Sequence, residues 1–274
     1  MKKAFFMTAA LLFAAVTAIA AEVILVADSM RYDPNTNLIT AAGNVHVTNP
    51  DGEVFGDYGS GSSDGDNMEM HGNVRGNYMD LDGGVINFSC ESAVITGRDN
   101  SNRVITATGD VKVSKGNDKL SARTVVLHAE VPIYSASGEV LGEFEAYSID
   151  ADDVSRDIDA ISARNVRKFY ERTRKVTMSA ARADGILQGE EISEMTAEGN
   201  VVITMPDNDG VMTRATGNKG IYSLARGTVV LSGGASITQK GRALNSDSIV
   251  YFLDTGHIDA HGSPSLIFEP DRKN

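Results

Sequence analysis

Hydrophobic and polar residues alternate in short stretches along most of the chain. In the segment LITAAGNVHV (38–47), apolar side chains fall on every second position, and polar or small side chains stand between them. Alternation with a period of two is typical of a β-strand that has one buried and one exposed face. We find no convincing long helix. The pattern predicts an all-β chain of many short antiparallel strands.

A repeat organises these strands. Three segments share an acidic or amide residue, a tyrosine four positions later and a glycine eleven positions after the tyrosine. They are Asp28/Tyr32/Gly43, Asn218/Tyr222/Gly233 and Asp247/Tyr251/Gly262. Residues 104–113 and 195–203 carry only the second half of the repeat. The glycine predicts a bend or bulge between two short strands, and we expect the tyrosines to be structural.

When the copies are aligned on the glycine, one register is apolar in nearly all of them and predicts a continuous inner surface. The candidate inward residues are Ile39, Ala41, Val45, Val47, Ile105, Ala107, Val111, Val113, Met195, Ala197, Val201, Ile203, Val229, Leu231, Ile237, Ile258 and Ala260. The intervening register is mostly polar, as at Thr40, His46 and Lys112. We expect this second register to face solvent.

The N-terminus predicts export. Two lysines precede an uncharged apolar run, and the small residues Ala18 and Ala20 flank Ile19 at a site typical of signal-peptide cleavage. We therefore expect a signal peptide at 1–20, a first β unit at 21–130 and a second at 131–274. The two units either are separate or form one continuous strand stack.

Two segments are less regular. Residues 59–66 (GSGSSDGD) predict a mobile loop or a long hairpin tip, and residues 134–190 lose the glycine signature. Residues 164–175 predict either a helix or an exposed strand pair. They also hold the clustered basic residues of the chain, for which a solvated surface or docking to an anionic head group or partner are the two hypotheses.

Composition excludes several function classes. The 274 residues carry a net charge of −12, which argues against a nucleic-acid partner. The single cysteine, Cys90, excludes an intrachain disulfide framework and is expected to be a buried thiol. The residues His257, Asp259 and His261 have the spacing of metal ligands on one strand face, but they fall in the outward register and predict a solvated face. We expect no catalytic residues, no metal site, no cofactor and no enzyme activity.

The segment ADSMRYDPNTNLITAAGNVHV (27–47), with its echoes at 107–113, 197–203 and 245–262, resembles the OstA/LptA family of periplasmic lipopolysaccharide-transport proteins. The same domain opens the outer-membrane translocon protein. The resemblance implies a twisted, partly open β-jelly roll in which lipid A chains lie against the inward residues. It also implies a periplasmic location and, as partners, lipopolysaccharide, a membrane-anchored transport protein and an outer-membrane translocon of similar β fold.

Two further hypotheses come from other classes. A secreted β-solenoid or surface-fibre protein has similar repeats but fills its interior with its own side chains, whereas a lipid carrier keeps space open. A β-helix enzyme ranks third, because no paired carboxylates stand out. Unpaired strand edges also predict head-to-tail self-association, which Pro264 and Pro270 are expected to weaken at the C-terminal edge.

Overall fold

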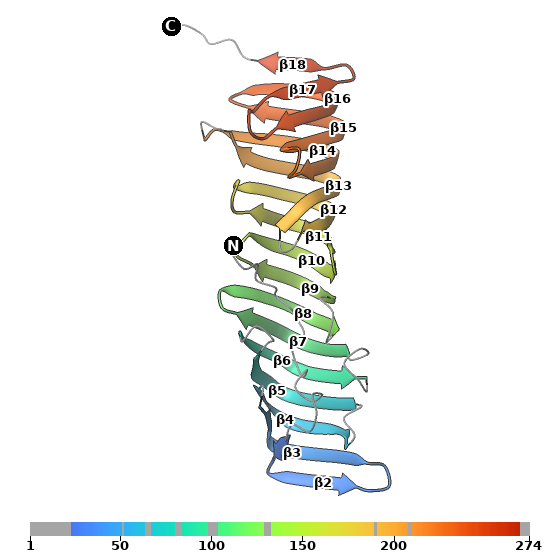
Figure 1. Cartoon of the computed structure of the whole chain (residues 1–274). Coiled ribbons are helices and arrows are strands. Elements are labelled where there is room, and N and C mark those ends of the chain that lie inside the picture. Colours follow the sequence, from blue (N-terminus) through green and yellow to red (C-terminus); the bar gives the residue numbers. More distant parts are fainter. Residues whose placement is uncertain are drawn as a thin grey trace. The chain divides into compact units, whose positions relative to one another are not determined.

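The computed structural model describes residues 23–50, 52–63, 67–79, 84–97, 104–128, 133–188, 191–207 and 210–268. The regular secondary structure of these residues consists of β-strands, so the all-β prediction is confirmed (Figure 1). Among them there is no helix with the length and apolar character needed to span a membrane. The expected signal peptide lies outside the described residues.

The chain divides into two compact units, which are described separately. The N-terminal unit holds residues up to Phe144 together with Ser155–Ile158, and the C-terminal unit holds Glu145–Val154 and the residues from Asp159 onward. This division by contacts is close to the join expected near residue 130. It does not test whether the units are separate domains, which stays a prediction.

The N-terminal unit contains nine strands. They are β1 (Ile24–Val26), β2 (Ser29–Asp33), β3 (Leu38–Asn49), β4 (Gly52–Ser62), β5 (Asn67–Met79), β6 (Val85–Thr96), β7 (Val104–Lys115), β8 (Asp118–His128) and β9 (Tyr134–Glu143). Strands β2 to β9 follow in chain order, each antiparallel to the next, and β1 pairs with β3. Consecutive hairpins therefore build the unit from β2 to β9, and β1 adds a pairing that skips β2.

The C-terminal unit follows the same plan. It contains the first part of β10 (Tyr147–Asp157), then β11 (Ala160–Glu171), β12 (Val176–Gln188), β13 (Glu191–Pro206), β14 (Met212–Ser223), β15 (Thr228–Gln239), β16 (Arg242–Phe252), β17 (Ile258–His261) and β18 (Ser265–Phe268). Both β17 and β18 pair with β16. Pro264 lies between these two short strands. Because proline has no N–H to donate, the pairing with β16 is interrupted at this position.

The repeated glycine forms a bulge, as predicted. In β3, Gly43 and Asn44 both have left-handed backbone, with φ of 75° and 50°. At this point four residues of β3, from Ala42 to Val45, oppose three residues of β4, from Gly56 to Tyr58. Two consecutive left-handed residues cost least for glycine followed by glycine, asparagine or aspartate. The sequence preference at this site therefore has a conformational cause.

The acidic or amide residue of the repeat lies beside this bulge. The side chain of Asp28 packs under Gly43, and the Asn44 side-chain amide donates to Asp28 Oδ2 at 2.9 Å. The same bond joins Asn73 to Asp57 at 2.8 Å. The two halves of the repeat are thus a turn-like bulge and the side chain that supports it.

The repeat is also more extensive than the sequence analysis found. Gly72 and Gly138 have the same left-handed backbone, and each is followed by a second left-handed residue, Asn73 or Glu139. The glycine bulge consequently occurs on β3, β5, β7, β9, β13 and β15, and β11, the remaining alternate strand, has a bulge without glycine beside the left-handed Asn165. The expectation that residues 134–190 lose the glycine signature is wrong, because Gly138 carries it.

Two further expectations are decided by the strands. Residues 59–62 belong to β4, so the mobile loop expected from residue 59 does not begin there; residues 64–66 lie outside the described part. Residues 164–171 belong to β11, and a turn then leads to β12, which confirms the strand pair over the helix.

The tyrosines of the repeat differ in their exposure, since Tyr251 is buried while Tyr32 is 53% exposed.

The predicted inner register is the core of both units. Fourteen of the seventeen candidate residues are buried, and Ile39, Ile258 and Ala260 are half-buried. Their polar neighbours Thr40 and His46 are half-buried on the other face, where the His46 ring stacks on Phe55 at 4.1 Å. The period of two therefore placed the apolar face correctly.

Candidate functional site

The N-terminal unit contains an apolar cavity of about 340 Å³. Four of the predicted inward residues line it: Ile39, Ala41, Val45 and Val47. The remaining lining residues are Val23, Leu25, Gly59, Ser60, Gly61, Ser62, Ser63, Met68, Glu69 and Met70. Strands β1, β3, β4 and β5 thus supply the walls.

Glycines of β4 leave this space open. Gly59 faces inward, and a Cβ atom at this position would lie 3.3 Å from Val45 Cγ1 and 3.5 Å from Met70 Sδ. A larger residue at 59 would therefore fill the space between these side chains. Gly61 has the same orientation one pleat further along β4 and also lines the cavity. Residues 59–63, part of the segment predicted as a mobile loop or a long hairpin tip, thus form one wall of the cavity.

The C-terminal unit contains a second cavity, of about 210 Å³. The predicted inward residues Met195, Ile203 and Val229 line it. The other lining residues are Ala146, Tyr147, Phe169, Glu171, Thr173, Arg174, Val176, Met178, Ile192, Tyr222 and Leu224. A much smaller hollow shares Phe169, Met178, Ile192 and Met195 with it, so the apolar space continues inward from the cavity.

One side of this second cavity is polar. Arg174 lies in the turn between β11 and β12, and its guanidinium donates to the Tyr222 hydroxyl of β14 at 2.6 Å. The carboxylate of Glu171 accepts hydrogen bonds from the backbone N–H groups of Thr173 and Arg174, each at 2.7 Å. A fixed turn therefore holds one arginine at the edge of an apolar space.

Sequence reasoning missed several residues of this cavity. Tyr147 and Phe169, whose rings are 5.6 Å apart, lie in the stretch that was thought to lack the repeat, and so does Met178. Their burial pattern does follow the period of two within β11 and β12. That alternation was the available signal. It does not show which alternating residues border open space.

The other predicted inward residues do not line these cavities. Ile105 and Leu231 have 0% exposed surface, and Ala107, Val111, Ala197, Val201 and Ile237 are 1–2% exposed. Val113 is also buried, at 5%. The interior around most of these residues is occupied by the protein's own side chains. Val113 is the exception, because it borders a third space of about 520 Å³ together with Phe88 and Leu120, lined also by polar residues such as Lys112 and Lys119.

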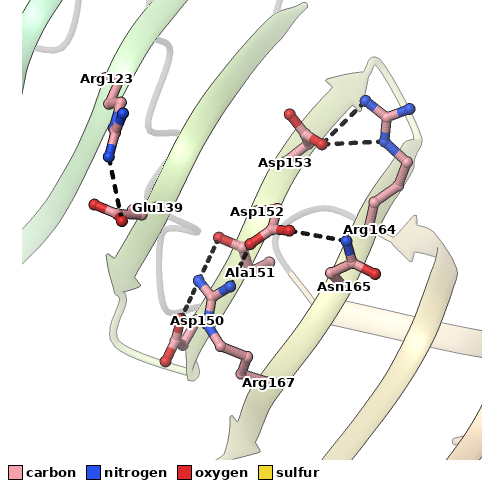
Figure 2. Close-up of polar contacts among 9 residues, drawn as sticks. All are labelled: Arg123, Glu139, Asp150, Ala151, Asp152, Asp153, Arg164, Asn165 and Arg167. Atoms are coloured by element: carbon pink, nitrogen blue, oxygen red, sulfur yellow. Dashed lines mark hydrogen bonds and ion pairs between the residues drawn. The ribbon is translucent and has the colours of Figure 1, made fainter.

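Two arginines of the basic cluster, Arg164 and Arg167, are paired with carboxylates (Figure 2). Arg164 bridges to Asp153 at 3.0 Å, and Arg167 bridges to Asp150 at 2.6 Å and to Asp152. Hydrogen bonds from Asn165 and Arg167 hold the pKa of Asp152 below its ordinary value. Asp150 and Asp152 in turn raise the pKa of Arg167. Both arginines are therefore neutralised within their own strand pair.

The remaining candidates for chemistry are exposed or shielded. His257, Asp259 and His261 are exposed, as expected of the outward register. Within the described ranges, no three histidine, cysteine or acidic residues are grouped closely enough to hold a metal ion. Cys90 is buried, and burial raises the pKa of its thiol to about 11. A thiol with this pKa is a poor nucleophile at neutral pH.

Comparison with known proteins gives three findings. No curated protein matches the chain. The chain is similar to the crystal structure of LptH, the LptA homologous periplasmic component of the conserved lipopolysaccharide transport device from Pseudomonas aeruginosa. The TM-score is 0.33 and the sequence identity 15%, over 56% of this chain and 95% of that chain.

The third finding is a match to a family model. Residues 91–257 match the family described as LptA/(LptD N-terminal domain) LPS transport protein. The matched range covers more than half of the chain and includes strands of both units. The chain therefore belongs to the LptA/(LptD N-terminal domain) family of LPS transport proteins.

Proposed function

We propose that this chain is a periplasmic carrier that covers the acyl chains of lipid A while lipopolysaccharide moves between the inner and outer membranes. The observation that supports this most is an apolar cavity in each unit, lined by the inward residues of a protein of the LPS transport family. The proposed role needs binding and release and no bond-making step, so we infer that the chain is not an enzyme.

The physical requirement for such a carrier is cover for hydrocarbon. Each methylene exposed to water costs about 0.8 kcal/mol, so a twelve-carbon chain costs about 9 kcal/mol and does not leave a membrane unaided. The walls of both cavities are mainly apolar, with Ile, Val, Met, Ala or Gly residues, and polar residues lie along part of each. Such walls take up an acyl chain without specific contacts, which suits a cargo that is later passed on.

The fully buried residues bear on how a chain would move. Ile105 on β7 has no exposed surface, whereas Ile39 on β3 borders the cavity of the same unit. We infer that hydrocarbon first occupies the cavities and reaches residues such as Ile105 only when the inner side chains move aside. The predicted inward residues would then all contact lipid, but at different stages of transport.

Strand edges are the proposed sites for protein partners. Strand β2 pairs with β3, and its side chains Met30 and Tyr32 are 52% and 53% exposed. An open edge can accept a strand from another chain of similar fold. The membrane-anchored transport protein, the outer-membrane translocon and a second copy of this chain are the proposed partners for such edges.

Site-specific photo-crosslinking tests the carrier function. A benzophenone amino acid would be placed at the cavity positions Ile39 and Met195, with the adjacent outward positions Thr40 and Thr196 as matched controls. The full chain would be produced in a bacterium that makes lipopolysaccharide, and adducts would be identified by mass spectrometry. We expect lipid A adducts at the two cavity positions only.

Two outcomes would contradict the proposal. Equal labelling at the inward and outward positions would refute the orientation of the lipid site. Absence of adducts at every position, together with absence of lipid from the purified chain, would refute the carrier function and favour a structural protein with a filled interior.

A further inference from the structure

Arg174 differs from the other arginines of its surroundings in its partner. Arg164 and Arg167 pair with aspartates of β10, and Arg182 pairs with Asp184 at 2.7 Å. The guanidinium of Arg174 instead donates to a neutral phenol, that of Tyr222. Within the part of the chain that the structure describes, it lies within ion-pair distance of no carboxylate. In a chain with a net charge of −12, this is an uncompensated positive charge.

The nearest acid does not neutralise it. Both oxygens of Glu171 accept hydrogen bonds from the backbone of the turn, at Thr173 and Arg174. The Glu171 carboxylate therefore fixes the turn on which Arg174 is carried. The half-buried Arg174 side chain then extends from a defined position along the edge of the cavity.

The cavity beside Arg174 is apolar and of limited size. Buried Phe169, Met178 and Met195 form its inner wall. Its volume of about 210 Å³ exceeds the roughly 150 Å³ of an engineered apolar cavity that binds benzene. It therefore has room for part of one hydrocarbon chain and not for several chains.

A guanidinium beside an apolar space has a specific chemical complement. Arginine binds phosphate through paired, charge-assisted hydrogen bonds, and these are stronger than a bond to a neutral hydroxyl. A phosphate at the edge of the cavity would thus displace Tyr222 as the partner of Arg174, with an alkyl chain extending toward Phe169. Tyr222 is placed to hold the guanidinium when the cavity is empty.

We propose that Arg174 binds the phosphate of an amphiphile whose hydrocarbon chain occupies the C-terminal cavity. This rests on the proposed carrier function and deepens it, because it assigns one residue to the charged part of the cargo. The apolar walls accept any chain of suitable length. Arg174 selects for an anionic head group, so an otherwise unselective cavity gains a preference.

Binding of two simple probes tests the assignment. Dodecyl phosphate carries the anionic group, and dodecyl maltoside has the same chain with a neutral head. Their affinities for the full-length chain would be measured by isothermal titration below micelle-forming concentrations. We expect Arg174→Gln to weaken dodecyl phosphate at least about tenfold and to leave dodecyl maltoside unchanged, since a hydrogen bond to a charged group is lost.

Matched variants separate this role from a structural one. Arg164→Gln removes a charge from the same cluster but does not border the cavity, and we expect it to change neither affinity. Arg174→Lys keeps a charge without the paired hydrogen bonds. We expect it to retain a preference for dodecyl phosphate, smaller than that of the unaltered chain. Circular dichroism would confirm the fold of each variant, and the lysine variant alone tests the preference if the glutamine variant does not fold.

Several results would overturn the assignment. Equal loss of both probes in Arg174→Gln would show a structural role, and no loss of either would show that Arg174 is not a contact. Inorganic phosphate that binds as tightly as dodecyl phosphate would show that the cavity contributes nothing. If neither probe binds the unaltered chain, the site is refuted. Lipid A adducts at Ile39 would then still support the carrier function, which fails only if they too are absent.

Discussion

Replacing Gly72 by alanine is expected to destabilise the N-terminal unit by more than the backbone conformation alone accounts for. Gly72 has φ of 74°, and a Cβ atom added there would lie 2.8 Å from Asp57 Cβ. Alanine in this region costs about 1–2 kcal/mol, of which the stiffer unfolded chain returns about 0.4–1 kcal/mol. The clash with Asp57 must then be relieved by moving a side chain that is bonded to Asn73.

Gly116 provides the matched control. It has φ of 59° in the turn between β7 and β8, and a Cβ atom there would have nothing within 4 Å. Gly116→Ala thus carries the conformational cost alone, about 1 kcal/mol. Gly72→Ala adds the displaced hydrogen bond between Asn73 and Asp57, worth about 1 kcal/mol more at an exposed site, so we expect a total of about 2–3 kcal/mol.

Urea unfolding followed by circular dichroism measures both variants, with unchanged slopes indicating that the midpoints report stability. A second substitution gives an independent check. Asp57→Ala removes the carboxylate, which includes the atom nearest to the added Cβ, and leaves only its own Cβ close by. The bond between Asn73 and Asp57 is then lost only once, so the double variant with Gly72→Ala should be more stable than the sum of the single effects by about 1 kcal/mol. Equal costs for Gly72→Ala and Gly116→Ala, or no coupling with Asp57, would refute the view that the supporting side chain fixes the bulge.

Four further predictions concern thiol reactivity, the pH dependence of stability, and assembly. Cys90 in the native chain should react with iodoacetamide at pH 8 roughly a hundredfold more slowly than in the unfolded chain, because its pKa is about 11 instead of 9.0. For the same reason the native thiol keeps a proton that the unfolded chain releases, so stability should fall as pH rises from 9.0 to about 11, and Cys90→Ala should remove this fall. Burial raises the pKa of Asp184, but hydrogen bonds from Arg182 and Ser162 lower it by more, so the net pKa lies below 3.8. The stability from this group should therefore be present above pH 3.8 and lost as pH falls, and Asp184→Asn should lack that loss. Light scattering over a concentration series should show only short assemblies, because Pro264 interrupts the C-terminal edge; stable long filaments would count against this.

Which side chains of each strand face inward was predictable, because it depends only on neighbouring residues. A residue and its second neighbour lie on the same face of a strand, so Ile105 and Ala107 were assigned inward from the sequence, and both are buried. The bulge was predictable for the same reason, since left-handed backbone at Gly43 and Asn44 favours those residue types. Gly72 and Gly138 were missed because the residues before them, MEM and YSA, differ from the ITA and MTA of the half-copies, although the triads GNV and GEV stand in the printed sequence.

The cavities were not predictable by such rules. Tyr147 and Tyr222 are 75 positions apart in the sequence and border the same space. How much volume remains between facing strands depends on the sizes of all the side chains that meet there, and this is set by long-range packing. Residues 164–175 were recognised as a basic cluster. Which of its arginines face an aspartate depends on the neighbouring strands, and this is why Arg174, whose partner is Tyr222, could not be told apart from Arg164 and Arg167.

The alternating bulges connect the fold with the proposed role. Because each one is fixed by local residues, such as Asp28 beneath Gly43, the inner face can vary in side-chain size without loss of strand register. The inner face is thereby free to be filled at Ile105 and open beside Gly59. An acyl chain that moved past Ile105 would exchange contacts with one apolar surface for contacts with another, which changes the exposed apolar area little. Transport along such an interior needs side chains to move aside, but it needs no stage at which hydrocarbon faces water.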